Sequence, residues 1–151
     1  MHYDPGARLG VPAHITLLYP FRPAEAAFDQ IDTLRSICES IAAFTFAFTE
    51  VRRFPATAYL HPDRSETFVE IMKTIQNQWP DCQPYGGAFT NMIPHLTVAD
   101  KVDQETLGVV ERALRPQLPI KCIACEIWLL RSDRSGIWSK AAGLELASSP
   151  V

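Results

Sequence analysis

The alternation of apolar and polar residues along this chain predicts short strands joined by tight turns. Phenylalanine alternates with smaller side chains at 44–49, and a second extended run at 55–60 follows a turn expected at 50–54. Near the C-terminus, polar residues at 131–136 are typical of a hairpin turn. We expect strands at 14–19, 44–49, 55–60, 95–99, 120–130 and 137–146.

Three other segments place apolar residues every three or four positions, which is typical of a helix with one buried face. They are 24–43, 65–79, and a segment that starts within 100–103 and ends near 114. Proline and glycine interrupt any regular pattern at 1–13 and at 80–94, so we expect both to be irregular, and 147–151 to be a frayed tail. This mixture of strands and helices predicts an α+β fold.

One four-residue pattern occurs twice. His14-Ile15-Thr16-Leu17 returns as His95-Leu96-Thr97-Val98, and each copy is His-apolar-Thr-apolar. Alternate side chains of a strand share a face, so each strand is expected to present its imidazole and hydroxyl on the same side. A single copy is compatible with an ordinary strand that contains a histidine. Two copies in a chain with 4 histidines indicate a shared site in which His14 faces His95.

The residues that flank both copies extend the pattern. The first copy lies within Val11-Pro12-Ala13-His14-Ile15-Thr16-Leu17-Leu18-Tyr19-Pro20-Phe21, and the second follows Pro84-Tyr85-Gly86-Gly87 and Ile93-Pro94. With these motifs the chain resembles the two-histidine (2H) phosphoesterase superfamily, specifically its bacterial 2′-5′ RNA ligase and cyclic phosphodiesterase proteins. The resemblance extends from about Asp4 to about Leu146.

The resemblance implies a bilobal fold with two pseudo-symmetric antiparallel sheet-plus-helix lobes around a central cleft. At 151 residues the chain fits a single domain, 1–151, with halves at roughly 14–80 and 81–146. Family members usually carry a strand before the first motif, and 1–13 lacks that pattern. This indicates either a gene start placed too late or an open sheet edge, which would favour self-association.

The resemblance also implies activity on cyclic or 2′-5′ phosphodiesters at a metal-free site. Hydrolysis needs one group to take a proton from water and another to give one to the leaving oxygen, and His14 and His95 suit these two roles in either order. Thr16 and Thr97 are expected to donate hydrogen bonds to the phosphate oxygens. Strand propensity is the alternative explanation for both threonines.

Four further residues are candidates for substrate contacts. Phe21 and Tyr85 lie on proline-flanked loops, where an aromatic ring can stack on a base. Tyr19 is a weaker candidate, because in a strand it would share the face opposite His14, which is compatible with a core position. Arg131 directly follows an expected strand and could supply positive charge, although a solvated turn is its ordinary environment.

The composition limits the classes of molecule that the protein is expected to bind. A net charge of −3 argues against an extended nucleic-acid surface but allows a small nucleotide or RNA-end phosphodiester as substrate. No transmembrane or secretory pattern is present, so we expect no membrane association and a cytoplasmic protein. We expect no cofactor.

The cysteines raise the possibility of zinc, because Cys122-x-x-Cys125 has ligand-like spacing. Residues three apart in a strand face opposite sides, so we favour reduced structural cysteines and expect no metal. A metal-dependent hydrolase would also need clustered carboxylates that are not evident. The sequence therefore predicts a metal-independent phosphoesterase, which also catalyses the reverse ligation, acting on a 2′,3′-cyclic phosphate. The alternative is a non-catalytic nucleotide- or phosphate-binding module of the same fold.

Overall fold

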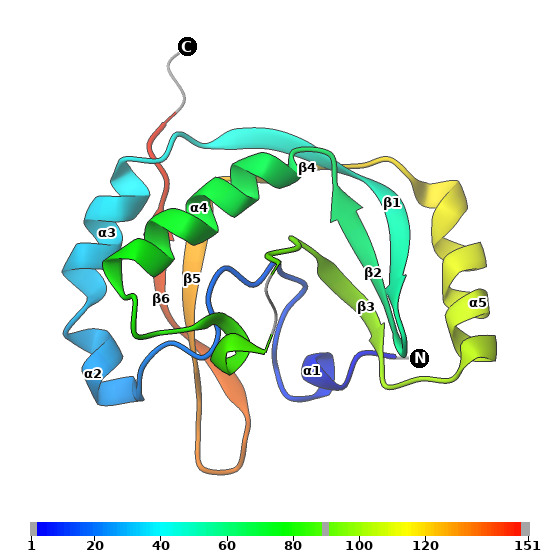
Figure 1. Ribbon diagram of the computed structural model, residues 1–151, viewed down its shortest axis with the longest axis horizontal. Helices are drawn as coiled ribbons and strands as arrows, with labels where there is room; N and C mark the ends of the chain where they lie inside the picture. The colour runs from blue at the N-terminus through cyan, green and yellow to red at the C-terminus, as the bar shows by residue number, and fades with distance from the viewer. Residues whose placement is uncertain (1–2, 89–90, 149–151) are drawn as a thin grey trace.

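A computed structural model describes residues 3–88 and 91–148, and the fold is α+β (Figure 1). The α-helices are α1 (Pro5–Arg8), α2 (Ala24–Phe28), α3 (Ile31–Glu39), α4 (Ser65–Gln78) and α5 (Gln104–Leu114). The strands are β1 (Phe44–Phe54), β2 (Thr57–Pro62), β3 (Leu96–Asp100), β4 (Ile120–Ala124), β5 (Glu126–Ser132) and β6 (Trp138–Glu145). Two short 3₁₀ turns, η1 (Pro84–Gly87) and η2 (Arg115–Gln117), complete the described elements.

Four antiparallel strands form a curled sheet in the order β3-β2-β1-β4 (Figure 1). Helix α5 covers one face, where Leu107 and Val110 pack against Ala58 of β2 and Ala99 of β3. Helix α4 packs against the rings of β1, with the Phe68 ring edge-on to the Phe44 and Phe46 rings. The part of the sheet around β2 and β3 is therefore supported by α5 from one side.

The second sheet is the hairpin of β5 and β6. Its turn is held by the Asp133 carboxylate, which accepts hydrogen bonds from the backbone N–H groups of Ser135 and Ile137. Gly136 has a φ of +82°, a conformation that glycine adopts without steric cost. The turn expected within 131–136 and the strand after it are confirmed.

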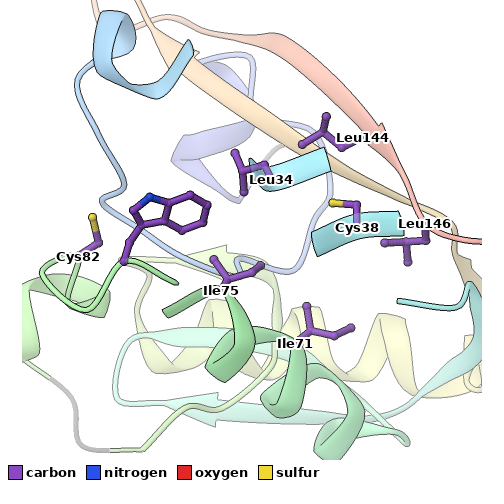
Figure 2. Packing of buried hydrophobic residues seen from close by; sticks show 8 residues of the cluster. Leu34, Cys38, Ile71, Ile75, Cys82, Leu144 and Leu146 are labelled. Carbon is purple, nitrogen blue, oxygen red and sulfur yellow. The ribbon is translucent and has the colours of Figure 1, made fainter. Parts of the chain in front are cut away.

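The main core joins distant parts of the chain (Figure 2). Leu34 and Cys38 of α3 lie with Ile71 and Ile75 of α4 and with Leu144 of β6. Trp79, Cys82 and Leu146 complete this buried cluster. Burial of such side chains contributes about 1.5–3 kcal/mol each, so the cluster binds the helices and the hairpin into one unit.

Several expected boundaries are wrong. The helix expected at 24–43 is two helices, α2 and α3, and the strand expected at 120–130 is split at Cys125 into strands of different sheets. The turn expected at 50–54 is part of β1, and the chain turns at Pro55-Ala56 instead. Arg52 and Arg53 pair across the sheet with Tyr59 and Ala58, so a polar run that suggested a turn is a strand.

The strand expected at the first motif is also wrong, because residues 11–20 form no strand. Within 3–13, the described part of the lead-in, the one regular element is α1; residues 1–2 and 149–151 lie outside the described ranges. The two sheets are unequal in size, so a pseudo-symmetric pair of lobes is not shown. No helix in the described ranges has the length and apolar character needed to cross a membrane.

Candidate active site

The second motif lies at the start of β3. Thr97 is within the strand opposite Tyr59, and His95 directly precedes the strand. The His95 ring is half-buried against two aromatic rings, with its centroid 5.4 Å from that of Phe54 and 5.5 Å from that of Tyr59. These contacts fix the plane of the imidazole.

The first motif is carried by an irregular loop, on which His14 is exposed. In Figure 1 the trace that follows α1 crosses the centre of the view before it reaches α2. Leu17 and Leu18 both pack against the main core cluster. Because neighbouring side chains of a strand point to opposite faces, this shared packing is incompatible with a regular strand.

The two imidazoles are nevertheless held in the same way. Nδ1 of His14 lies 2.7 Å from the backbone oxygen of Pro12, and Nδ1 of His95 lies 2.7 Å from that of Ile93. A carbonyl oxygen only accepts hydrogen bonds, so Nδ1 carries the proton in both rings. In the neutral form Nε2 is therefore the basic nitrogen of each histidine.

The threonines differ. The Thr16 hydroxyl lies 3.1 Å from Nε2 of His14, where it donates a hydrogen bond to the neutral imidazole. Thr97 is half-buried in β3, and its hydroxyl makes no hydrogen bond to a side chain or backbone group within the described ranges. The Thr97 hydroxyl is thus available to a ligand, whereas that of Thr16 already contacts its own motif histidine.

Trp138 contacts the loop that carries His14. Its backbone N–H donates to the Leu9 oxygen at 2.7 Å, and its ring centroid lies 6.1 Å from that of Tyr19. Gly10 has a φ of +88°, and a Cβ there would lie 2.6 Å from the Trp138 oxygen. The backbone N–H of Tyr85 also donates to the Tyr19 oxygen at 2.6 Å. Sequence reasoning missed Trp138, for which the sequence carries no signal.

The structure separates the expected substrate contacts. Tyr19 is 47% exposed and Tyr85 40%, with their ring centroids 6.1 Å apart, so the core position considered for Tyr19 is wrong. Phe21 is half-buried, 4.9 Å from the Trp79 ring in the main core. Arg131 is exposed in β5, opposite Ser139, and its side chain makes no hydrogen bond or ion pair with another described residue.

Two arginines of β1 have different carboxylate partners. Arg53 reaches α5, where it pairs with Glu111. Arg52 pairs with Glu50 at 2.8 Å and lies opposite Tyr59, whose ring contacts His95. The Arg52 guanidinium lowers the pKa of the Glu50 carboxyl, mainly through their hydrogen bond. Arg52 therefore lies on the strand pair that supports His95, a position that the sequence alone did not reveal.

His61 is half-buried at the end of β2. Its Nδ1 is buried and has no hydrogen-bond partner in the described part of the chain. Burial is the main cause that lowers the pKa of His61, and the positive charge of Arg52 adds to it, whereas a hydrogen bond to the Pro94 backbone acts in the opposite direction. His61 thus contacts the residue that precedes His95.

The cysteines are free thiols. Cys122 is half-buried in β4, where burial raises its pKa, and Cys125 is exposed between β4 and β5. Across residues 3–88 and 91–148, no group of three His, Cys, Asp or Glu side chains is arranged to hold a metal ion.

Comparison with protein families identifies a match. Residues 1–136 match the family described as the 2'-5' RNA ligase superfamily, so the match spans α1 through the β5–β6 turn and includes both motifs. A comparison with curated proteins gave no match.

Proposed function

Because the chain belongs to the 2'-5' RNA ligase superfamily, we propose that it is a metal-independent phosphoesterase of the cytoplasm. Its substrate is a small cyclic or 2′-5′ nucleotide phosphodiester, and a 2′,3′-cyclic phosphate end fits this class. Ligation is the same reaction in reverse. His14 and His95 form the acid-base pair, and Thr16 and Thr97 bind the phosphate.

The shared anchoring of the imidazoles supports this proposal most strongly. Two histidines far apart in the sequence, one on a loop and one at a strand start, both donate from Nδ1 to a backbone oxygen at 2.7 Å. Such a bond orients the ring and fixes the tautomer, leaving Nε2 to exchange protons with a ligand. Two histidines with purely structural roles would not be expected to share this bond at the same position of both motif copies.

In the proposed mechanism one imidazole is neutral and the other protonated. The neutral Nε2 takes a proton from water, whose oxygen attacks phosphorus in line with the leaving oxygen. As that P–O bond breaks, the protonated imidazole gives its Nε2 proton to the leaving oxygen. The net change is addition of one water molecule across one P–O bond, and the two imidazoles end with exchanged protonation states.

The threonines stabilise the charge that develops on the non-bridging oxygens. Among the described residues the Thr97 hydroxyl has no hydrogen-bond partner, which leaves it available for this role. Thr16 must rotate its hydroxyl proton from Nε2 of His14 toward the phosphate. This exchange would release the His14 lone pair at the moment the substrate binds.

The remainder of the substrate would contact exposed aromatic and basic groups. Tyr19 and Tyr85 offer adjacent rings on which the base of a neighbouring nucleotide can stack. Arg131 would approach a phosphate from the hairpin, and the half-buried Phe21 would add a further aromatic contact to the substrate. We place the cleft between two lobes of a single domain, with halves near 14–80 and 81–146, and each half contributes one motif.

A screen of purified protein against 2′,3′-cyclic nucleotides, 2′-5′ dinucleotides and cyclic ADP-ribose phosphates tests this function. The proposal expects turnover of at least one of them, with loss of turnover in His14→Ala and in His95→Ala. Binding of a nucleotide with no turnover of any compound would instead support the non-catalytic binding module.

A further inference from the structure

A cavity of about 550 Å³ adjoins the second motif, between α4 and the strands β1 and β2. Ile93 and Pro94 line it and lead directly into His95. Tyr59 also lines it, and its ring centroid lies 5.5 Å from that of His95. A group esterified to a phosphate at His95 therefore lies next to this cavity.

The size and walls of the cavity suit a nucleoside. Small-molecule sites typically enclose about 300–1,000 Å³, so the volume greatly exceeds the needs of a phosphate alone. Val69, Met92, Ile93 and Pro94 provide apolar surface. A nucleobase has apolar faces and a polar edge, so it matches walls of this kind when charged groups face its edge.

The charged groups of the cavity come mainly from α4. Glu66 and Glu70 lie one turn apart on the same helix face, and both line the cavity. Lys73 follows on that face, and Arg52 faces it from β1. Within the described ranges neither carboxylate nor Lys73 has an ion-pair partner, whereas Arg52 is bound by Glu50. Two carboxylates and one ammonium group are therefore available to a ligand.

This set of groups distinguishes the bases. A carboxylate only accepts hydrogen bonds, so it favours a base that presents N–H donors. Guanine presents two neighbouring donors, N1–H and N2–H₂, on the same edge as its O6 acceptor. Uracil presents one N–H donor between two acceptors. Lysine and arginine pair with O6 and N7 of guanine. The carboxylates of the cavity therefore match the N–H donors of guanine, and its cationic side chains match the acceptors.

We propose that this cavity binds the guanine nucleoside attached to the reacting phosphate, with the base edge against Glu66 and Glu70 and O6 toward Lys73. The inference rests on the proposed function, because it takes the phosphate to lie at His95, and it adds a base preference that the acid-base chemistry does not require.

Calorimetric titration of the parent protein with guanosine 3′-phosphate and uridine 3′-phosphate tests the preference without catalysis. We expect the guanosine compound to bind at least about tenfold more tightly, because its N–H donors make hydrogen bonds to charged carboxylates that uridine cannot match. Equal affinities, or no binding of either compound, would overturn the inference.

The variants Glu66→Gln and Glu70→Gln keep the size of each side chain and replace an acceptor oxygen with a donor. Each variant should bind guanosine 3′-phosphate about tenfold more weakly than the parent protein does. Its affinity for uridine 3′-phosphate should stay within about twofold of the parental value. Glu105→Gln changes an exposed residue in the first turn of α5 and is the matched control. It should change the affinity for neither nucleotide. Unchanged guanosine affinity in both cavity variants would contradict the proposal.

Turnover separates this inference from the proposed function. Hydrolysis of the guanosine, adenosine, cytidine and uridine 2′,3′-cyclic phosphates with equal kcat/KM would refute the base preference and leave the phosphoesterase intact. Selective guanosine binding without hydrolysis of any cyclic phosphate would refute the phosphoesterase and leave the cavity assignment standing.

Discussion

His14 and His95 both donate from Nδ1 to the backbone oxygen of the residue two positions earlier, at 2.7 Å in each case. The surroundings of the two rings otherwise differ. The His14 ring is exposed and contacts Thr16, whereas the His95 ring is half-buried against Phe54 and Tyr59. The common bond, not a common secondary structure, is what the two motifs share.

Removal of the motif hydroxyls should weaken transition-state stabilisation. Thr16→Val and Thr97→Val keep the side-chain shape and should each cost about 1.5–3 kcal/mol in kcat/KM, which is about 10- to 100-fold, if the hydroxyl meets a charged phosphate oxygen. Steady-state kinetics with a cyclic nucleotide measure this loss. A threonine whose valine variant retains parental kcat/KM has no role in binding the phosphate.

The loop that carries His14 should depend on Gly10. Gly10→Ala places a Cβ 2.6 Å from the Trp138 oxygen, which is a steric clash. The φ of +88° at this position is also a backbone conformation that alanine adopts only with strain. We expect a loss of about 1 kcal/mol or more in the free energy of unfolding, together with a fall in kcat.

Gly136→Ala is the matched control, because its φ is +82° and a Cβ there meets no atom within 4 Å. Denaturant unfolding of both variants separates the conformational cost that they share from the clash that belongs to Gly10. Equal losses of stability and activity in the two variants would contradict a special role for the Gly10–Trp138 contact.

His61 should make the protein less stable in mild acid. Burial and Arg52 lower its folded pKa below the ordinary value of 6.5, so the folded state favours the neutral ring. Its contribution to stability is present above the unfolded pKa and is lost as the pH falls through the lower folded pKa.

Denaturant unfolding from pH 7 to pH 5 measures this effect, and His61→Gln should flatten the decline relative to the parent. The carboxylates with lowered pKa values, such as Asp81 and Glu111, titrate below this window and lose their contribution at lower pH. An identical decline in the parent and in His61→Gln would exclude His61 as its source.

Chelation should leave turnover unchanged, because the proposed mechanism assigns every proton transfer and every phosphate contact to side chains. Dialysis against EDTA followed by an assay with a cyclic nucleotide measures this. Loss of turnover that a specific divalent ion restores would show that the two-histidine mechanism is incomplete.

The sequence predicted those parts of the fold that depend on local patterns. The helix expected at 65–79 is α4, and the β5–β6 hairpin follows from the polar turn that contains Asp133 and Gly136. The hairpin of β1 and β2 was also predicted, with its turn placed too early. Arg52 and Arg53 point to opposite faces of β1, where each finds a carboxylate partner that a single sequence does not reveal.

The first motif shows the limit of such reasoning. Alternation predicts which residues of a strand share a face, but a strand also needs a neighbour, and residues 11–20 pair with none. Leu17 and Leu18 instead both reach the main core, and Trp138 holds the loop from another sheet. The motif residues stand out in the sequence as a repeated pattern, whereas the tertiary contacts that position them depend on Trp138, Tyr59 and Phe54.

The most direct test is the pH dependence of turnover for the parent, His14→Ala and His95→Ala with one 2′,3′-cyclic nucleotide. Since the mechanism needs one neutral and one protonated imidazole, the parental rate should pass through a maximum near neutral pH, with limbs that belong to the coupled pair. Each alanine variant should lose about 10²–10⁴-fold in kcat and flatten one limb, while it still binds the nucleotide. Near-parental turnover in either variant would contradict the assignment of that histidine, and in both it would contradict the two-histidine mechanism.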